Sequence, residues 1–136
     1  MLVPPLQFGD GGPGGWWTLD EPELRLGEDV LVPDLAGWRR ERLPALPREA
    51  AFTVRPDWIC EVLSPSTTRN DRTKKLPAYA ASGVPHLWLL DPLAQMLEVY
   101  ELPGGHWSLL AAHGGEEVVR AVPFEMVALD LKRLWA

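Results

Sequence analysis

The chain is poor in cysteine and in long apolar runs, and each shortage excludes a class of protein. A single cysteine, Cys60, among 136 residues excludes an internal disulfide and a zinc-finger ligand set. No apolar run approaches the roughly 18–20 residues that a membrane helix needs. The first residues also lack the basic-then-apolar order of a signal peptide. We therefore predict a cytoplasmic protein that makes no contact with a membrane.

Positive charge is also scarce, but it is concentrated. The net charge is -6, which argues against a nucleic-acid partner because phosphates are bound by Lys and Arg. Residues 38–77, however, hold nine basic and five acidic side chains, a local net charge of +4. Such a stretch is either an ordinary solvated surface or a basic surface that contacts a polyanion. The sequence leaves both interpretations open.

The remaining composition is that of one globular domain. Hydrophobic residues make up 46% and charged residues 24%, both ordinary for a folded domain. Together, 14 prolines and 12 glycines exclude a bundle of long helices. Residues 1–15, rich in Pro and Gly, are expected to form an N-terminal arm. Residues 16–136 are expected to form a single domain.

The order of predicted elements indicates an α/β (α+β) fold. Alternating or continuous apolar runs bounded by turn residues predict strands at 23–26, 30–32, 57–63, 84–90, 96–102 and 106–112. Residues 67–82 are expected to form a helix that Thr68 or Asn70 caps, that Gly83 ends, and that Pro77 kinks unless it lies in the first turn. No regular element is expected in 37–50, an edge strand in 116–122, and a helical turn at 131–135. This order predicts a mixed central sheet with a βαβ crossover and C-terminal antiparallel hairpins.

Three residues stand out against this background. Glu61 lies inside an apolar strand, and a buried carboxylate must be hydrogen-bonded, paired, protonated or bound to a metal. Asp34 follows a short apolar strand and a proline, where a strand is expected to leave the sheet. Lys75 lies on the helix that follows the Glu61 strand. Each has an ordinary alternative: an ion pair with an arginine for Glu61, a turn for Asp34, and a solvated pair with Asp71 for Lys75.

Taken together, the three residues suit metal-dependent hydrolysis of a phosphodiester bond. Two carboxylates at adjacent strand ends can hold Mg²⁺ (or Mn²⁺), which prefers oxygen ligands. A nearby lysine can orient the attacking water and stabilise charge on the phosphate. Cys60 should point to the opposite face of the strand from Glu61, where we expect it to pack in the core.

Longer runs carry a family resemblance. They are Val-Pro-Asp-Leu at 32–35, Pro-Asp-Trp-Ile-Cys-Glu-Val-Leu-Ser-Pro-Ser-Thr at 56–67, Asp-Arg-Thr-Lys-Lys-Leu at 71–76, Tyr79, and Gly-Val-Pro-His-Leu-Trp-Leu-Leu-Asp-Pro at 83–92. These runs resemble the Uma-type putative restriction endonucleases, bacterial members of the PD-(D/E)XK nuclease superfamily. The resemblance covers about residues 16 to 135.

The resemblance implies a restriction-endonuclease-like core, a mixed central sheet flanked by helices, with a metal site at one edge. Asp34 matches the aspartate of the Pro-Asp motif and Glu61 the second acid. The backbone carbonyl of Val62 would be a further metal ligand. Family members usually carry a further N-terminal helical segment, which the resemblance implies this chain lacks. The apolar surface left by a lost segment would favour a homodimer.

The resemblance also assigns the lysine. The superfamily's usual lysine position, two residues after the second acid, is Leu63 here. Lys75 on the following helix matches the substitute that this family uses. Asp71 and Tyr79 match recurrent family positions, where we expect them to support the site.

Three functional hypotheses follow. The first is a Mg²⁺-dependent DNA endonuclease that contacts phosphates through Arg39, Arg40, Arg42, Arg69 and Arg72. The second is a catalytically inactive nuclease-fold module for binding or assembly. The third is an unrelated β-rich protein in which Glu61 and Lys75 form a structural ion pair.

Overall fold

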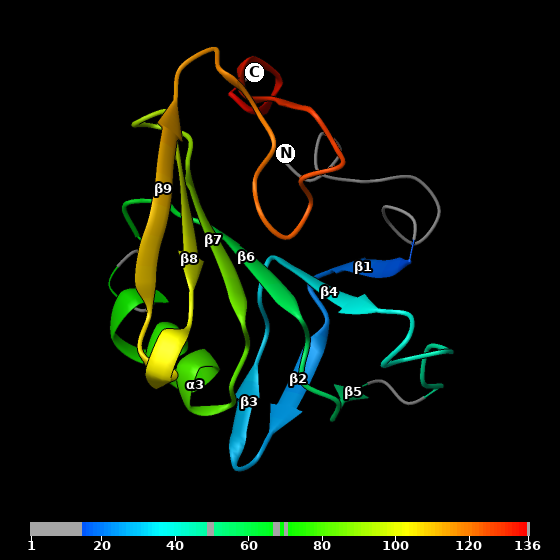
Figure 1. Ribbon diagram of the computed structural model, residues 1–136. Coiled ribbons are helices and arrows are strands. Elements are labelled where there is room, and N and C mark those ends of the chain that lie inside the picture. The colour runs from blue at the N-terminus through cyan, green and yellow to red at the C-terminus, as the bar shows by residue number, and fades with distance from the viewer. Residues whose placement is uncertain (1–14, 49–50, 67–68, 70, 136) are drawn as a thin grey trace.

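A six-stranded mixed sheet organises the protein, whose computed structural model describes residues 15–48, 51–66, 69 and 71–135 (Figure 1). In spatial order the strands are β1 (Trp16–Asp20), β4 (Leu35–Arg39), β6 (Trp58–Val62), β7 (His86–Asp91), β8 (Met96–Glu101) and β9 (Ser108–Gly114). Strands β6 and β7 are parallel, and every other neighbouring pair is antiparallel. The predicted crossover and C-terminal hairpins are therefore confirmed.

Shorter elements complete the described chain. A second sheet has the order β3 (Asp29–Leu31), β2 (Glu23–Leu26) and β5 (Ala51–Phe52). The edge strand predicted within 116–122 is β10 (Val118–Val119), which pairs with β11 (Leu129–Asp130) and does not extend the main sheet. Two short 3₁₀ turns are η2 (Pro103–Gly105) and η3 (Leu131–Leu134), and η3 is the predicted C-terminal helical turn. None of the helices in the described residues is both long and apolar enough to cross a membrane.

The main sheet is covered on both faces, as a central strand with an apolar interior requires. Trp58 and Cys60 of β6 pack with the C-terminal segment around Phe124 and Leu131. Ile59, which points the other way, packs with a cluster that includes residues of β2 and the helix α3 (Leu76–Ala81). Figure 1 shows α3 and the β2–β3 hairpin on one side of the sheet and the orange-to-red C-terminal segment on the other. Glu61 lies on the α3 side, and Cys60 lies on the opposite face, as expected.

Strand β4 corrects the sequence-based expectation that residues 37–50 contain no regular element. This stretch begins with Gly37, which lies inside β4 and where a side chain would meet aromatic rings. A Cβ on Gly37 would lie 3.1 Å from the ring of Trp58 and 3.2 Å from that of Trp16. The glycine therefore serves close packing between strands. As a result, Asp34 lies where β4 begins, and the strand before it, β3, belongs to the second sheet.

The crossover between β6 and β7 is not the single regular helix that was expected. It contains a wide π-helical turn, η1 (Asp71–Lys75), followed directly by α3. Pro77 lies in the first turn of α3, where its missing N–H costs little and the helix needs no kink. Gly83 ends the helix with a φ of 80°, as predicted. The proposed caps Thr68 and Asn70, and the predicted N-terminal arm except Gly15, lie outside the described residues.

Candidate active site

Asp34 and Glu61 meet at one edge of the main sheet. Because β4 and β6 are antiparallel, the beginning of β4 lies beside the end of β6. Two hydrogen bonds join Asp34 to the end of β6, one to Glu61 and one to Val62. The Asp34 N–H donates to Glu61 Oε1 at 3.2 Å, and the Val62 N–H donates to Asp34 Oδ2 at 2.7 Å. Glu61 Oε1 therefore lies one hydrogen bond away from the backbone of the residue that carries the second carboxylate.

The Glu61 carboxylate is fully buried and is held by two side chains from the crossover. The Tyr79 hydroxyl donates to Glu61 Oε2 at 2.7 Å, and Lys75 Nζ lies 3.1 Å from the same oxygen. These contacts satisfy the need for a buried carboxylate to be paired and hydrogen-bonded. The partner of Glu61 in this pair is thus the lysine, not the arginine that the structural alternative suggested. The resemblance predicts a supporting role for Tyr79, and its hydroxyl contacts Glu61.

Lys75 connects the crossover to the segment that precedes Asp34. Its ammonium group donates to the Val32 carbonyl oxygen at 3.0 Å as well as contacting Glu61. Lys75 is thereby fixed between two acceptors from different parts of the chain. The contribution of Val32 could not be read from the sequence, because every residue carries a carbonyl oxygen. The alternative pair of Lys75 with Asp71 involves the Asp71 side chain, which lies outside the described part of the structure.

Trp107 also supports this arrangement, although no motif in the sequence points to it. Its indole N–H donates to the Leu76 carbonyl at 2.9 Å. Leu76 directly follows Lys75 and begins α3. The contact ties the β8–β9 connection to the helix at the residue next to the lysine, so it helps to fix the height of Lys75 above the sheet.

The donor set at this edge fits a hard divalent cation. A carboxylate has about four lone-pair positions, and Asp34 accepts one hydrogen bond from Val62. In a strand the N–H and C=O of one residue point to the same side, so we expect the Val62 carbonyl to point toward Asp34. Nowhere in the described ranges do three His, Cys, Asp or Glu side chains gather as a metal site. Mg²⁺ does not require such a cluster, because it keeps several waters and is commonly held by one or two carboxylates.

Three of the five arginines predicted to contact phosphates lie at the far end of the same strands. Arg39, the last residue of β4, is five positions from Asp34 along the chain, and the β4–β6 pairing places it beyond the beginning of β6. Its guanidinium lies 4.6 Å from the Trp16 ring centroid. Arg40 stacks in the same way on Trp17, at 3.9 Å.

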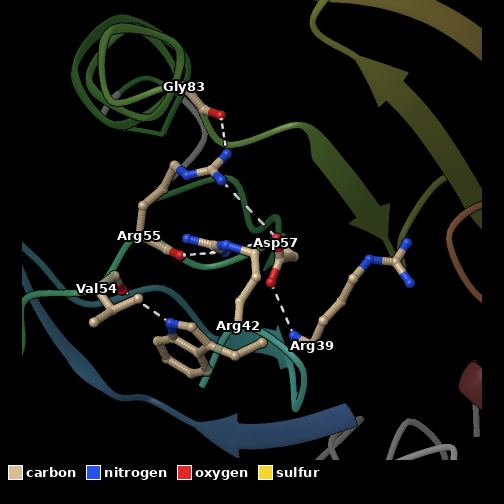
Figure 2. A network of polar contacts seen from close by, with 7 residues as sticks. Arg39, Arg42, Val54, Arg55, Asp57 and Gly83 are labelled. Atoms are coloured by element: carbon tan, nitrogen blue, oxygen red, sulfur yellow. Dashed lines mark hydrogen bonds and ion pairs between the residues drawn. The ribbon is translucent and has the colours of Figure 1, made fainter. Parts of the chain in front are cut away.

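Arg42 belongs to a buried polar network at this far end (Figure 2). It forms an ion pair with Asp57 at 2.7 Å, and the Asp57 side chain is only 6% exposed. The other Asp57 oxygen accepts the Arg39 backbone N–H, and Arg55 approaches Asp57 to 4.0 Å. The Arg39 guanidinium points away from Asp57 in this view. The network gives Arg42 a structural role in joining β4 to the residue that precedes β6.

The other two arginines lie on the crossover, close in sequence to Lys75. Arg69 is exposed, and its carbonyl accepts the Thr73 hydroxyl at 2.6 Å. Arg72 lies on η1 and contacts Glu98 of β8 at 3.3 Å. The structure therefore divides the five predicted arginines into a distant group of three and a group of two on the same segment as the candidate lysine.

Cys60 is buried in a way that disfavours catalysis, and His86 lies away from the candidate site. Burial raises the pKa of the Cys60 thiol well above its ordinary value, and the Glu61 and Asp34 charges act in the same direction. A thiol kept protonated is a poor nucleophile. Burial likewise lowers the pKa of His86, which lies at the beginning of β7, at the Asp57 end of the sheet.

The comparisons with known proteins agree with this fold. The chain matches the Uma2 family, described as putative restriction endonuclease, over residues 7–132 and belongs to that family. A solved structure, a putative nuclease belonging to DUF820 from Anabaena variabilis ATCC 29413, matches with a TM-score of 0.71 and 25% sequence identity. The match covers 89% of this chain and 68% of that one. No curated protein matches the chain. The predicted family is therefore confirmed, and so is its mixed sheet with a parallel β6–α3–β7 crossover.

Proposed function

We propose that the protein is a metal-dependent endonuclease that hydrolyses phosphodiester bonds in DNA. The observation that carries this proposal is the fully buried Glu61 carboxylate, held by Lys75 and Tyr79 beside the carboxylate of Asp34. Ionisable groups in such costly surroundings cluster at functional sites. Membership of a family described as putative restriction endonuclease points in the same direction.

Each residue has a defined task in this proposal. Asp34, Glu61 and the Val62 carbonyl would hold Mg²⁺ or Mn²⁺, which supplies Lewis-acid activation of water and of the phosphate. Lys75, fixed between Glu61 and Val32, orients the attacking water through its ammonium protons and stabilises negative charge on the phosphate. Tyr79 keeps Glu61 Oε2 in place and so directs Oε1 toward Asp34.

Plasmid nicking with Mg²⁺ or Mn²⁺ tests the proposal. We expect Asp34→Asn, Glu61→Gln and Lys75→Met each to lower the nicking rate by about 10²-fold or more, the scale seen when one preorganised polar group is lost. Asp29→Asn and Lys132→Met are matched controls. Both residues are exposed and lie outside the candidate site, so both variants should cleave like the wild type. Circular dichroism establishes that each variant is folded. Wild-type activity in a folded Glu61→Gln or Asp34→Asn variant contradicts the assignment.

The second candidate function, an inactive binding or assembly module, rests on the same contacts. Lys75 and Tyr79 already satisfy Glu61 Oε2, as they would in a purely structural ion pair. Calorimetric titration with Mg²⁺ and Mn²⁺ separates the two. A folded wild type that binds neither ion below the millimolar range supports the module, whereas binding that Asp34→Asn abolishes supports the nuclease.

A further inference from the structure

A third acid lies in the same row of the main sheet as the candidate site. Glu61 on β6 is opposite Leu89 on β7, and Leu89 is opposite Glu98 on β8. Residues that lie opposite one another in a sheet share a face. Neighbouring strands are about 4.8 Å apart, so Glu98 lies about 10 Å from Glu61 across the sheet. Both side chains face the crossover.

The crossover places a cation over each of these two acids. Lys75 lies over Glu61, and Arg72, three residues earlier on η1, lies over Glu98 with Nη2 3.3 Å from Oε1. The two pairs differ in exposure. The Lys75 and Glu61 side chains are 19% and 0% exposed, and those of Arg72 and Glu98 are 46% and 23% exposed. The outer pair is thus open to a ligand on the same face as the candidate site.

Tyr100 lies beside the outer pair. It follows Glu98 by two positions on β8 and so shares its face. Burial raises the pKa of the Tyr100 hydroxyl, and the Glu98 charge adds to this effect while Arg72 opposes it. The three groups therefore lie close enough to interact, and Arg72 contacts both the Glu98 carboxylate and the Tyr100 hydroxyl.

We infer that Arg72, Glu98 and Tyr100 form a phosphate clamp, in which Arg72 binds a backbone phosphate near the one that is cleaved and Glu98 positions Arg72. This inference rests on the proposed function, because it assumes a nucleic-acid strand at the site. Phosphates of one strand advance about 3.4 Å per nucleotide along the helix axis. A separation of about 10 Å therefore corresponds to a phosphate within about three nucleotides of the reacting one.

The chemistry of the pair favours this role over one in stability. A guanidinium has five N–H donors in a planar fork, so its contact with Glu98 leaves donors for a bidentate bond to a phosphate. Exposed ion pairs contribute little to folding. The neighbouring crossover residues Arg69 and Lys74 are also exposed and basic, which matches a negatively charged strand. Glu98 brings a negative charge close to that strand. If charge alone mattered, removing Glu98 would strengthen DNA binding, whereas loss of its support for Arg72 would weaken it.

The experiment measures binding of a short fluorescein-labelled DNA duplex by anisotropy, in EDTA so that no cleavage occurs, over a series of salt concentrations. We expect Arg72→Ala to weaken binding about tenfold and to reduce the slope of log K against log salt by about one. Glu98→Ala should also weaken binding although it removes a negative charge, because Arg72 loses its brace. Glu98→Gln, which keeps the acceptor oxygen, should bind at least as well as the wild type. Arg133→Ala and Glu116→Ala, both exposed and elsewhere, are the charge-matched controls.

The outcomes separate the clamp from the proposed function. An Arg72→Ala slope equal to that of the wild type overturns the clamp, as does a Glu98→Ala variant that binds DNA more tightly. In either case normal metal-dependent nicking by the wild type leaves the endonuclease proposal intact. A wild type that neither binds the duplex nor nicks plasmid overturns both.

Discussion

Lys75 is the residue whose loss should reveal most directly how the Glu61 carboxylate is held. Lys75→Met keeps an apolar stem of similar length but removes the ammonium group 3.1 Å from Oε2. Removal of one partner from a buried ion pair costs about 3–5 kcal/mol. Lys75 is 19% exposed, and Glu61 retains hydrogen bonds from Tyr79 and from the Asp34 N–H. We therefore expect a loss near the lower end, about 3 kcal/mol.

Urea unfolding followed by tryptophan fluorescence measures this loss, which is large against a typical domain stability of about 5–15 kcal/mol. Lys74→Met is the control, because its exposed side chain should change the free energy of unfolding by less than about 0.5 kcal/mol. The double variant with Glu61→Gln should be more stable than the sum of the single effects predicts, by at least about 1 kcal/mol. Additive effects, or a Lys75→Met variant as stable as Lys74→Met, would refute the account of a buried pair.

Three further predictions concern stability and use the same urea assay. Tyr79→Phe should lower the free energy of unfolding by about 1.5–3 kcal/mol, the value of a hydrogen bond to a charged group; no measurable change would mean that water replaces the hydroxyl. Gly37→Ala should cost about 1–3 kcal/mol by overpacking against Trp58, and a neutral result would show that the rings can shift. The pKa of His86 is lowered in the folded protein, so protonation of His86 costs more there than in the unfolded chain. The free energy of unfolding should therefore fall as the pH drops below the unfolded-state pKa of about 6.5. His86→Gln should flatten this dependence while His106→Gln should not, and equal slopes in the two variants would argue against His86 as its source.

The sequence predicted those parts of the fold that are determined by neighbouring residues. The β6 strand, the crossover region and β7 each have a local signature: an apolar run, a helical spacing ended by Gly83, and a second apolar run. These three elements also determine where Glu61 and Lys75 lie relative to each other. The acid and the lysine of the site could therefore be paired from sequence with only the usual geometry of a parallel crossover.

Strand β4 could not be predicted in this way because its stability comes from residues far away in the chain. Its five residues include Gly37, which has no side chain and so leaves room for the rings of Trp58 and Trp16. Without β4, Asp34 had to be placed at the end of the preceding strand. The family resemblance still singled out Asp34 as a candidate, since the Pro-Asp motif does not depend on knowing which strand carries it. The hydrogen bonds that join Asp34 to Glu61 and Val62 depend on the register of β4 against β6, so they could not be predicted without β4.

The basic stretch shows why a count of charges cannot locate a binding surface. Residues 38–77 run from the last residues of β4 through β6 to the beginning of α3, so the stretch crosses the whole length of the central strands. Its arginines consequently lie at both ends of the sheet. Those near β4 stack on tryptophans or neutralise the buried Asp57, whereas Arg69 and Arg72 lie on the segment that carries Lys75. If DNA binds at the candidate site, the salt dependence of binding should thus respond to Arg72 and not to Arg42, although both belong to one basic run in the sequence.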